Sequence, residues 1–172
     1  MTMKSSSEHQ DQVRRGPLWR YALFTVPIIV GVGFLMGQVS NSGYGNDWFD
    51  ALRKPAAMPP GWMFGAAWTL LYIALGIAIA LVLRAPSSRA RNIGISLFVA
   101  QMLLNYAWSP VFFGMHQPRI AFVIIVAMLG LSIATAFVFR TVSRPAALLM
   151  LPYLAWLAFA SFLNYEIIRL NS

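Results

Sequence analysis

Five long apolar segments, separated by shorter stretches that carry the charges, dominate the pattern of hydrophobic and polar positions along the chain. Each segment can hold the ~20 apolar residues that a helix needs to cross a hydrocarbon core of about 30 Å. Runs such as 71–83 and 120–131 do not alternate apolar and polar residues, which excludes a transmembrane barrel. The pattern predicts an all-α integral membrane protein, a bundle of five transmembrane helices. The predicted spans are approximately 21–40, 62–83, 93–113, 120–139 and 146–168.

The composition agrees with this class of protein. Of the 172 residues, 59% are hydrophobic and only 10% are charged, whereas a soluble globular domain carries roughly 25% charged residues. The absence of cysteine excludes a disulfide scaffold, thiolate catalysis and cysteine-based metal sites. The net charge of +8 would suggest nucleic acid in a soluble chain. Because the bases flank apolar runs instead of clustering on one stripe, we expect no nucleic-acid partner.

The basic residues also predict the orientation of the chain in a membrane. Residues 1–17 form a polar tail and residues 18–172 one membrane domain; the first apolar run lacks a clear cleavage site, so we interpret it as a retained span. Five spans put the termini on opposite sides. The N-terminal side carries most of the bases, which are Lys4, Arg14, Arg15, Arg20, Arg84, Arg89, Arg91, Arg140 and Arg144. The other side carries Arg53, Lys54, Arg119 and Arg169. The positive-inside rule therefore predicts N-in, C-out.

The connections between the spans differ in length. Those after the second, third and fourth spans are short, which predicts that consecutive helices pack as antiparallel neighbours. The first runs from about residue 40 to 61, and loops of that length inside compact domains are uncommon and often functional. Within it, residues 47–54 have acids at the start and bases at the end, which predicts a short amphipathic helix. Its Trp48, Phe49 and Leu52 either fold over the bundle as a lid or anchor at the headgroup level.

The predicted spans have no ionisable residue in their middle. Such groups cost at least ~2.5–3.5 kcal/mol at the bilayer centre and usually mark proton relays or ion pathways. Their absence argues against a pump or a proton-coupled carrier. The two histidines are His9 in the tail and His116 in a short connection, and neither offers a haem-iron ligand inside a pocket. We predict no metal site and no required cofactor.

Three of the spans instead carry aromatic and amide side chains at helical spacing. Residues at steps of three or four lie on one face of a helix. These stripes comprise Phe64, Trp68 and Tyr72 in the second span, Gln101, Asn105 and Trp108 in the third, and Tyr153, Trp156, Ala160 and Asn164 in the fifth. Packing between helices explains each stripe singly, whereas the combination is typical of a ligand pocket with apolar walls and a few polar groups. Pro110 and Pro152 interrupt backbone hydrogen bonding beside Trp108 and Trp156 and favour a cavity.

Several motifs, in order and at matching spacing from about Phe34 to Arg169, resemble one known family. They are the segment 48–55 (WFDALRKP), Pro59-Pro60-Gly61 with Trp68, Asn105-x-x-Trp108-x-Pro110-x-Phe112-Phe113-Gly114, and Pro152-Tyr153-Leu154-Ala155-Trp156 with Leu163-Asn164-Tyr165. The chain resembles the TspO/MBR family, which includes the tryptophan-rich sensory proteins of bacteria and the mitochondrial translocator protein, also called the peripheral benzodiazepine receptor.

This resemblance implies a five-helix bundle, commonly a homodimer, in a bacterial membrane. It implies a pocket near the long first loop that binds protoporphyrin IX and related tetrapyrroles, synthetic benzodiazepine-type ligands, and lipids or sterols. The positions that match the family's pocket include Phe49, Pro59, Asn105, Trp108 and Ala160. In bacterial relatives, the tryptophans that match Trp68 and Trp156 are linked to light- and oxygen-dependent breakdown of protoporphyrin, which makes these two the candidate catalytic residues.

Together, the stripes and the resemblance define a candidate ligand-binding set. It contains Trp48, Phe49, Pro59, Phe64, Trp68, Tyr72, Asn105, Trp108, Tyr153, Trp156 and Ala160. Arg53 or Lys54 could pair with porphyrin propionates at the membrane edge. The chain departs from many relatives at Ala56-Ala57-Met58, where they carry tryptophan, and at Phe49, where they often carry tyrosine.

Two weaker patterns have an alternative each. Leu163, Tyr165 and Arg169 fit a short cholesterol-contact motif, which an interfacial Tyr and Arg explain equally well. Gly33-x-x-x-Gly37 supports either a dimer seam or packing within the monomer.

The function that these observations favour is a membrane receptor or sensor that binds porphyrins, protoporphyrin IX or haem, in a tryptophan-rich pocket. Light- and oxygen-dependent porphyrin degradation in the same pocket, which would make the protein an enzyme, stays open. The alternative is a small transporter of porphyrins or other amphiphiles.

Overall fold

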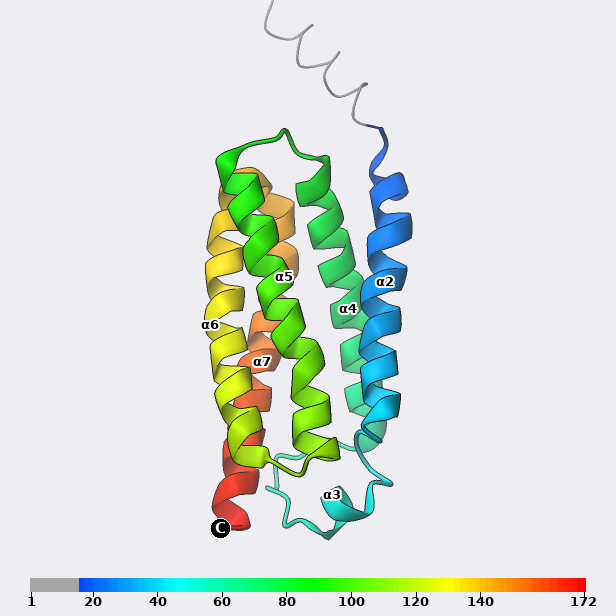
Figure 1. Ribbon diagram of the computed structural model, residues 1–172, viewed down its shortest axis with the longest axis vertical. Coiled ribbons are helices and arrows are strands. Elements are labelled where there is room, and N and C mark those ends of the chain that lie inside the picture. Colours follow the sequence, from blue (N-terminus) through cyan, green and yellow to red (C-terminus); the bar gives the residue numbers. More distant parts are fainter. Residues whose placement is uncertain (1–15) are drawn as a thin grey trace, which may run out of the picture.

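The computed structural model describes residues 16–172, and over this range it is all-helical, without a strand (Figure 1). Its five long helices are long and apolar enough to cross a membrane, which confirms the predicted fold class. They are α2 (Leu18–Val39), α4 (Gly61–Arg84), α5 (Arg89–Ser109), α6 (Pro118–Val142) and α7 (Arg144–Leu170). A short helix, α3 (Asp47–Ala51), lies in the first loop, and a π-helical turn, η1 (Pro110–Gly114), continues α5. The polar tail predicted for residues 1–17 lies, up to residue 15, outside the described residues.

The order of the helices around the bundle differs from the expected one. α4 packs mainly against α2 and α7, and α6 packs between α5 and α7. The expectation that consecutive helices are neighbours is therefore wrong for α4 and α5, which share few contacts although a short connection joins them (Figure 1). A short connection fixes only where the next helix begins; the fit between side chains decides which helix it packs against.

Two glycines allow α2 and α4 to approach each other closely. A Cβ on Gly76 would lie 2.7 Å from the Cα of Val26, and the Thr25 hydroxyl donates a hydrogen bond of 2.7 Å to the Gly76 carbonyl. A Cβ on Gly33 would overlap the ring of Tyr72. Of the two readings of the Gly33-x-x-x-Gly37 pattern, the structure places Gly33 in packing within the monomer.

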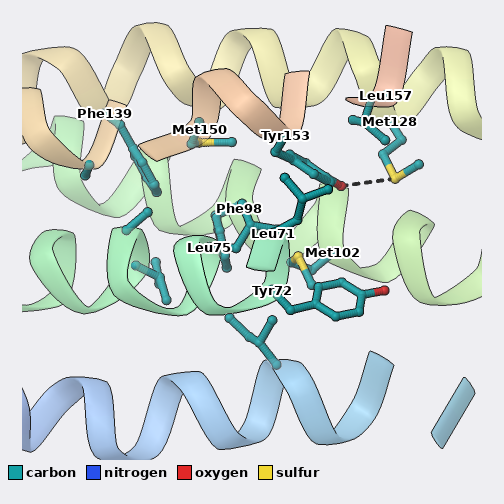
Figure 2. Packing of buried hydrophobic residues seen from close by; sticks show 14 of the residues in the cluster. Leu71, Tyr72, Leu75, Phe98, Met102, Met128, Phe139, Met150, Tyr153 and Leu157 are labelled. Atoms are coloured by element: carbon teal, nitrogen blue, oxygen red, sulfur yellow. Dashed lines mark hydrogen bonds between the residues drawn. The ribbon is translucent and has the colours of Figure 1, made fainter. Parts of the chain in front are cut away.

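The half of the bundle nearest the α4–α5 connection is filled with side chains. Leu75, Phe139 and Met150 are completely buried there, and the rings of Phe98 and Phe139 are stacked at 5.9 Å. Figure 2 shows these side chains in successive layers, with the hydroxyl of Tyr153 reaching the sulfur of Met128 at the edge of the cluster. A cavity lies in the opposite half of the bundle.

The first loop, residues 40–60, lies across that opposite end of the bundle (Figure 1). The Asn46 side chain caps α3 by accepting a hydrogen bond from the Phe49 N–H. α3 ends at Ala51 instead of continuing to residue 54 as expected, and the backbone at Leu52 is extended. Pro55 disfavours helical backbone at the preceding residue, Lys54, so a helix is expected to end at or before that position. Lys54 lies beyond the helix, and its Nζ donates to the carbonyl of Asp50 (3.0 Å).

The loop is also tied to the end of the chain. The side chain of Asn171 accepts a hydrogen bond from the Arg53 N–H (2.9 Å) and donates one to the Arg53 carbonyl (3.0 Å). Phe49 anchors the loop on the other side, where it is buried and its ring lies 5.1 Å from that of Phe113. The loop is thus held at two points, by the packing of Phe49 against Phe113 and by the hydrogen bonds between Arg53 and Asn171.

Candidate ligand cavity

A cavity of about 420 Å³ lies between α2, α4, α5 and α7, at the end covered by the first loop. Its volume falls within the range of roughly 300–1,000 Å³ that is usual for small-molecule sites. Eight residues of the predicted binding set line it, namely Phe49, Phe64, Trp68, Tyr72, Asn105, Trp108, Trp156 and Ala160. The three aromatic stripes, whose convergence the sequence left open, therefore meet at one space.

Three predicted residues lie elsewhere. Trp48 stacks on His116, with ring centroids 4.5 Å apart, and so joins the loop to the α5–α6 connection. Pro59 is buried, and its carbonyl accepts a hydrogen bond from the Tyr44 hydroxyl (3.2 Å). Tyr153 is completely buried behind the cavity wall. These three support the wall or the loop and do not line the space.

The wall is built from aromatic rings in mutual contact. The ring of Trp68 lies 5.2 Å from that of Tyr72 and 6.3 Å from that of Trp156, and Phe64 packs edge-on against Trp156 at 5.8 Å. Trp108 is oriented by Asn164, whose Oδ1 accepts a hydrogen bond from the indole N–H (3.3 Å). Such ring pairs stabilise their arrangement beyond simple burial, so the wall is a preformed surface.

A chain of hydrogen bonds fixes the deep end of the cavity. The Tyr72 hydroxyl donates to Asn105 Oδ1 (2.8 Å), and Asn105 Nδ2 donates to the Tyr153 hydroxyl (3.0 Å). Tyr153 in turn donates to Gln101 Oε1 (2.8 Å), which also accepts from Ser132 (3.2 Å). This network joins α4, α5, α6 and α7, and within a membrane each such bond contributes roughly 0.6–2 kcal/mol.

Hydroxyl groups close the opposite end of the cavity, near the loop. Ser40 Oγ lies 2.8 Å from Ser42 Oγ and 3.0 Å from Ser109 Oγ, and Ser42 and Ser109 are also hydrogen-bonded to each other. Asn41 and Gly43 adopt positive φ angles of 47° and 99°, which turn the chain sharply after α2. The end of α2 is thereby fastened to the end of α5.

The sequence analysis did not identify the glycines that line the cavity, which contribute backbone atoms to its wall and no side-chain ring. Gly33, Gly37, Gly61 and Gly65 all line the cavity, and a Cβ on Gly37 or Gly65 would meet nothing within 4 Å. The available signal was a pair of glycines four residues apart on each of two helices, Gly33 with Gly37 and Gly61 with Gly65. The first pair predicted a dimer seam or packing within the monomer, and neither pair was interpreted as part of a cavity wall. Ser42, Ser109, Phe113 and Met128 also line the space.

The residues predicted to pair with porphyrin propionates, and those of the sterol motif, lie outside the cavity lining. Arg53 and Lys54 do not line the cavity, and Lys54 Nζ lies over the Phe49 ring at 4.7 Å. In the sterol motif Leu163 is buried, Tyr165 is half exposed, and Arg169 pairs with Glu166 at 2.7 Å. Within residues 16–172, no three His, Cys, Asp or Glu side chains form a group that could hold a metal ion.

Comparison with known proteins identifies the family. The model of the TspO/MBR family matches residues 24–170. The tryptophan-rich protein TspO of Chlorobaculum tepidum is 39% identical over 147 residues, which cover 85% of this chain and 92% of that protein. The translocator protein of Ovis aries is 39% identical over 141 residues, covering 81% and 83%. The tryptophan-rich protein TspO of Archaeoglobus fulgidus is 35% identical over 147 residues, covering 84% and 92%. The chain belongs to the TspO/MBR family and is a multi-pass integral membrane protein.

Proposed function

We propose that the protein is a membrane receptor or sensor that binds a porphyrin, such as protoporphyrin IX, in the cavity beneath the first loop. The observation that carries this proposal is the meeting of Trp68, Trp108 and Trp156 around one space of about 420 Å³. A porphyrin is a broad flat π system, and each favourable contact with an indole or phenyl ring adds ~0.5–1.5 kcal/mol beyond area burial. The first loop serves as the lid, with Phe49 as its contact to the ligand.

The filled half of the bundle favours a receptor over a transporter. Passage across the membrane would require the layers around Leu75, Phe139 and Met150 to open, and all three side chains are completely buried. The cavity instead ends at the hydrogen-bonded network of Tyr72, Asn105 and Tyr153. Porphyrin flux through liposomes that contain only this protein would overturn this assignment.

The distribution of bases supports an orientation for the site. The α4–α5 and α6–α7 connections, together with the start of α2, carry Arg20, Arg84, Arg89, Arg91, Arg140 and Arg144. By the positive-inside rule these ends face the cytoplasm. The loop and the cavity then lie on the opposite, extracytoplasmic side, in a bacterial membrane.

Binding is tested by titrating protoporphyrin IX into the purified protein in the dark, with the porphyrin absorption spectrum as the readout. The variant Trp68→Phe/Trp156→Phe removes two indoles from the wall. The matched control, Trp19→Phe/Trp62→Phe, removes two indoles that are 60% and 73% exposed on the outside of the bundle. The proposal predicts saturable binding that the first variant loses and the control keeps; binding that is absent, or equal in both variants, would contradict it.

Light- and oxygen-dependent degradation is proposed as a second activity of the same site. Trp68 and Trp156 both line the cavity with their rings 6.3 Å apart, so a bound porphyrin contacts both indoles. An indole can transfer one electron to the photoexcited porphyrin, and the porphyrin radical anion passes that electron to dioxygen, which leaves superoxide and an indole radical cation. The indole radical cation takes one electron from the macrocycle and is restored, and the oxidised macrocycle combines with superoxide, so that the net reaction adds dioxygen to the porphyrin. Bleaching of bound porphyrin under light and air is therefore expected to slow in the single variants Trp68→Phe and Trp156→Phe, each of which keeps the other indole, when all proteins are saturated. Equal bleaching rates at equal occupancy would remove the role of the two indoles.

A further inference from the structure

The cavity walls are uncharged. Among residues 16–172, no Asp, Glu, Lys, Arg or His side chain lines the space. Two charged side chains of the loop are engaged elsewhere: Asp50 Oδ2 accepts a hydrogen bond from the Gly45 N–H (2.8 Å), and Lys54 Nζ donates to the carbonyls of Asp50 (3.0 Å) and Leu52 (3.3 Å). An anionic group that entered the cavity would find no counter-charge on its walls.

Several polar side chains of the wall are bonded to one another, and two further ones, Gln38 and Asn41, are exposed. Tyr72 donates its hydroxyl proton to Asn105, and the Asn105 amide donates to Tyr153. Ser42 and Ser109 are hydrogen-bonded to each other near the loop. To solvate a carboxylate, these groups would have to give up the bonds that hold the helices together.

One buried donor of the wall has no partner. Trp156 lines the cavity, and its indole Nε1 is buried with no hydrogen-bond partner among the described residues. Buried polar groups without a partner are uncommon in native proteins and call for an explanation. Because this nitrogen is itself buried, it presents no donor to a charged group in the cavity, and a single donor would not replace the hydration of an ionised carboxylate.

We infer that the cavity takes only the uncharged part of its ligand and that ionised groups stay outside it. This inference rests on the porphyrin binding proposed above. Moving an ionised carboxylate into an apolar site without a paired charge is far more costly than moving a neutral group. A dicarboxylic porphyrin therefore binds with its macrocycle inside and its two propionates at the membrane surface. The part of the ligand that the cavity favours is flat and uncharged.

The test compares protoporphyrin IX with its dimethyl ester, which has the same macrocycle and no ionisable propionate. Both are titrated in the dark into the detergent-solubilised protein, with the porphyrin absorption spectrum as the readout. Parallel titrations of the Trp68→Phe/Trp156→Phe variant correct for partition of each porphyrin into the micelles. The Trp19→Phe/Trp62→Phe variant verifies that exposed indoles do not produce the signal.

The expected result is that the ester binds as tightly as the diacid, within about threefold, or more tightly, and that the cavity variant loses both. An ester that binds more than about threefold more weakly than the diacid would overturn the inference while leaving porphyrin binding intact, because it would mean that the propionates are recognised. If neither porphyrin binds saturably, the proposed function itself is wrong and the inference falls with it.

Discussion

Replacing Gly33 by alanine tests the link between helix packing and the cavity. A Cβ at this position overlaps the ring of Tyr72, which lines the cavity and donates its hydroxyl proton to Asn105. The ring must therefore leave its place, which breaks the Tyr72–Asn105 hydrogen bond and displaces part of the aromatic wall. Gly31, on the same helix, offers the matched control, because a Cβ there meets nothing within 4 Å and the residue does not line the cavity.

The expected magnitude follows from the two contacts that are lost. Leaving the buried Asn105 acceptor without its donor costs about 1–3 kcal/mol, which corresponds to a fall in melting temperature of roughly 2–12 °C for a protein of this size. Loss of one aromatic contact to the porphyrin costs about 0.5–1.5 kcal/mol, so the dissociation constant rises by up to about tenfold.

Melting curves and dark porphyrin titrations of the Gly33→Ala and Gly31→Ala variants measure both effects. We expect Gly33→Ala to melt earlier and bind more weakly, and Gly31→Ala to keep the stability and the porphyrin affinity of the original protein. If Gly33→Ala is as stable and binds as tightly as Gly31→Ala, the Tyr72 ring is not held where the structure places it, and the reasoning fails.

Three further changes test separate features of the fold. Gly76→Ala places a Cβ 2.7 Å from the Cα of Val26, so overpacking should destabilise the protein by about 1–3 kcal/mol in melting curves. The control Gly130→Ala, with open space around its Cβ, should change stability by less than about 0.5 kcal/mol. Equal melting temperatures of the two variants would contradict the close approach of α2 and α4. Asn171→Ala removes both hydrogen bonds to the backbone of Arg53, so the first loop should be cut faster by protease in native conditions, and an unchanged cleavage rate would show that this tie does not hold the loop. A reporter that fluoresces only in the cytoplasm should stay dark when fused to the C-terminus, and a bright fusion would refute the N-in orientation.

The number and location of the helices could be predicted from the sequence because hydrocarbon thickness and the absence of charge fix them directly. The predicted boundaries fell short by a few residues, as at α6, which runs from Pro118 to Val142 instead of 120–139. Charged residues at the ends, such as Arg119 and Arg140, were read as the limits of the spans, yet a helix can continue past them into the headgroup region.

The order of the helices could not be predicted from the same pattern. Contact between α4 and α7 depends on which faces fit, and every helix in an apolar bundle carries apolar residues on all sides. The turn at Pro110 illustrates the same limit. The sequence predicts that Pro110 interrupts the helical hydrogen bonding but not the form of the interruption. The chain continues as the π-helical turn η1 and buries Phe112 and Phe113, a conformation that depends on their packing against Phe49 and Trp108.

The candidate site could be predicted as far as its large side chains. Trp68, Asn105 and Trp156 carry strong chemical signals at helical spacing, so the stripes and the family motifs both pointed to them. The glycines of α2 and α4 and the serines near the loop carry no such signal, because their contribution is empty space or a bond between two small hydroxyls. Tyr153 lay on a predicted stripe but faces the network behind the wall, a difference of a fraction of a helical turn.

The most direct test of the central claim is to observe each indole while a porphyrin binds. The protein contains six tryptophans, so labelling with 5-fluorotryptophan provides a separate fluorine resonance for each, assigned with single Trp→Phe variants. When protoporphyrin IX is added in the dark, its ring current should shift the resonances of Trp68, Trp108 and Trp156 and leave those of the outward-facing Trp19 and Trp62 unchanged. Shifts confined to Trp19 and Trp62, with the three cavity indoles unaffected, would contradict the account.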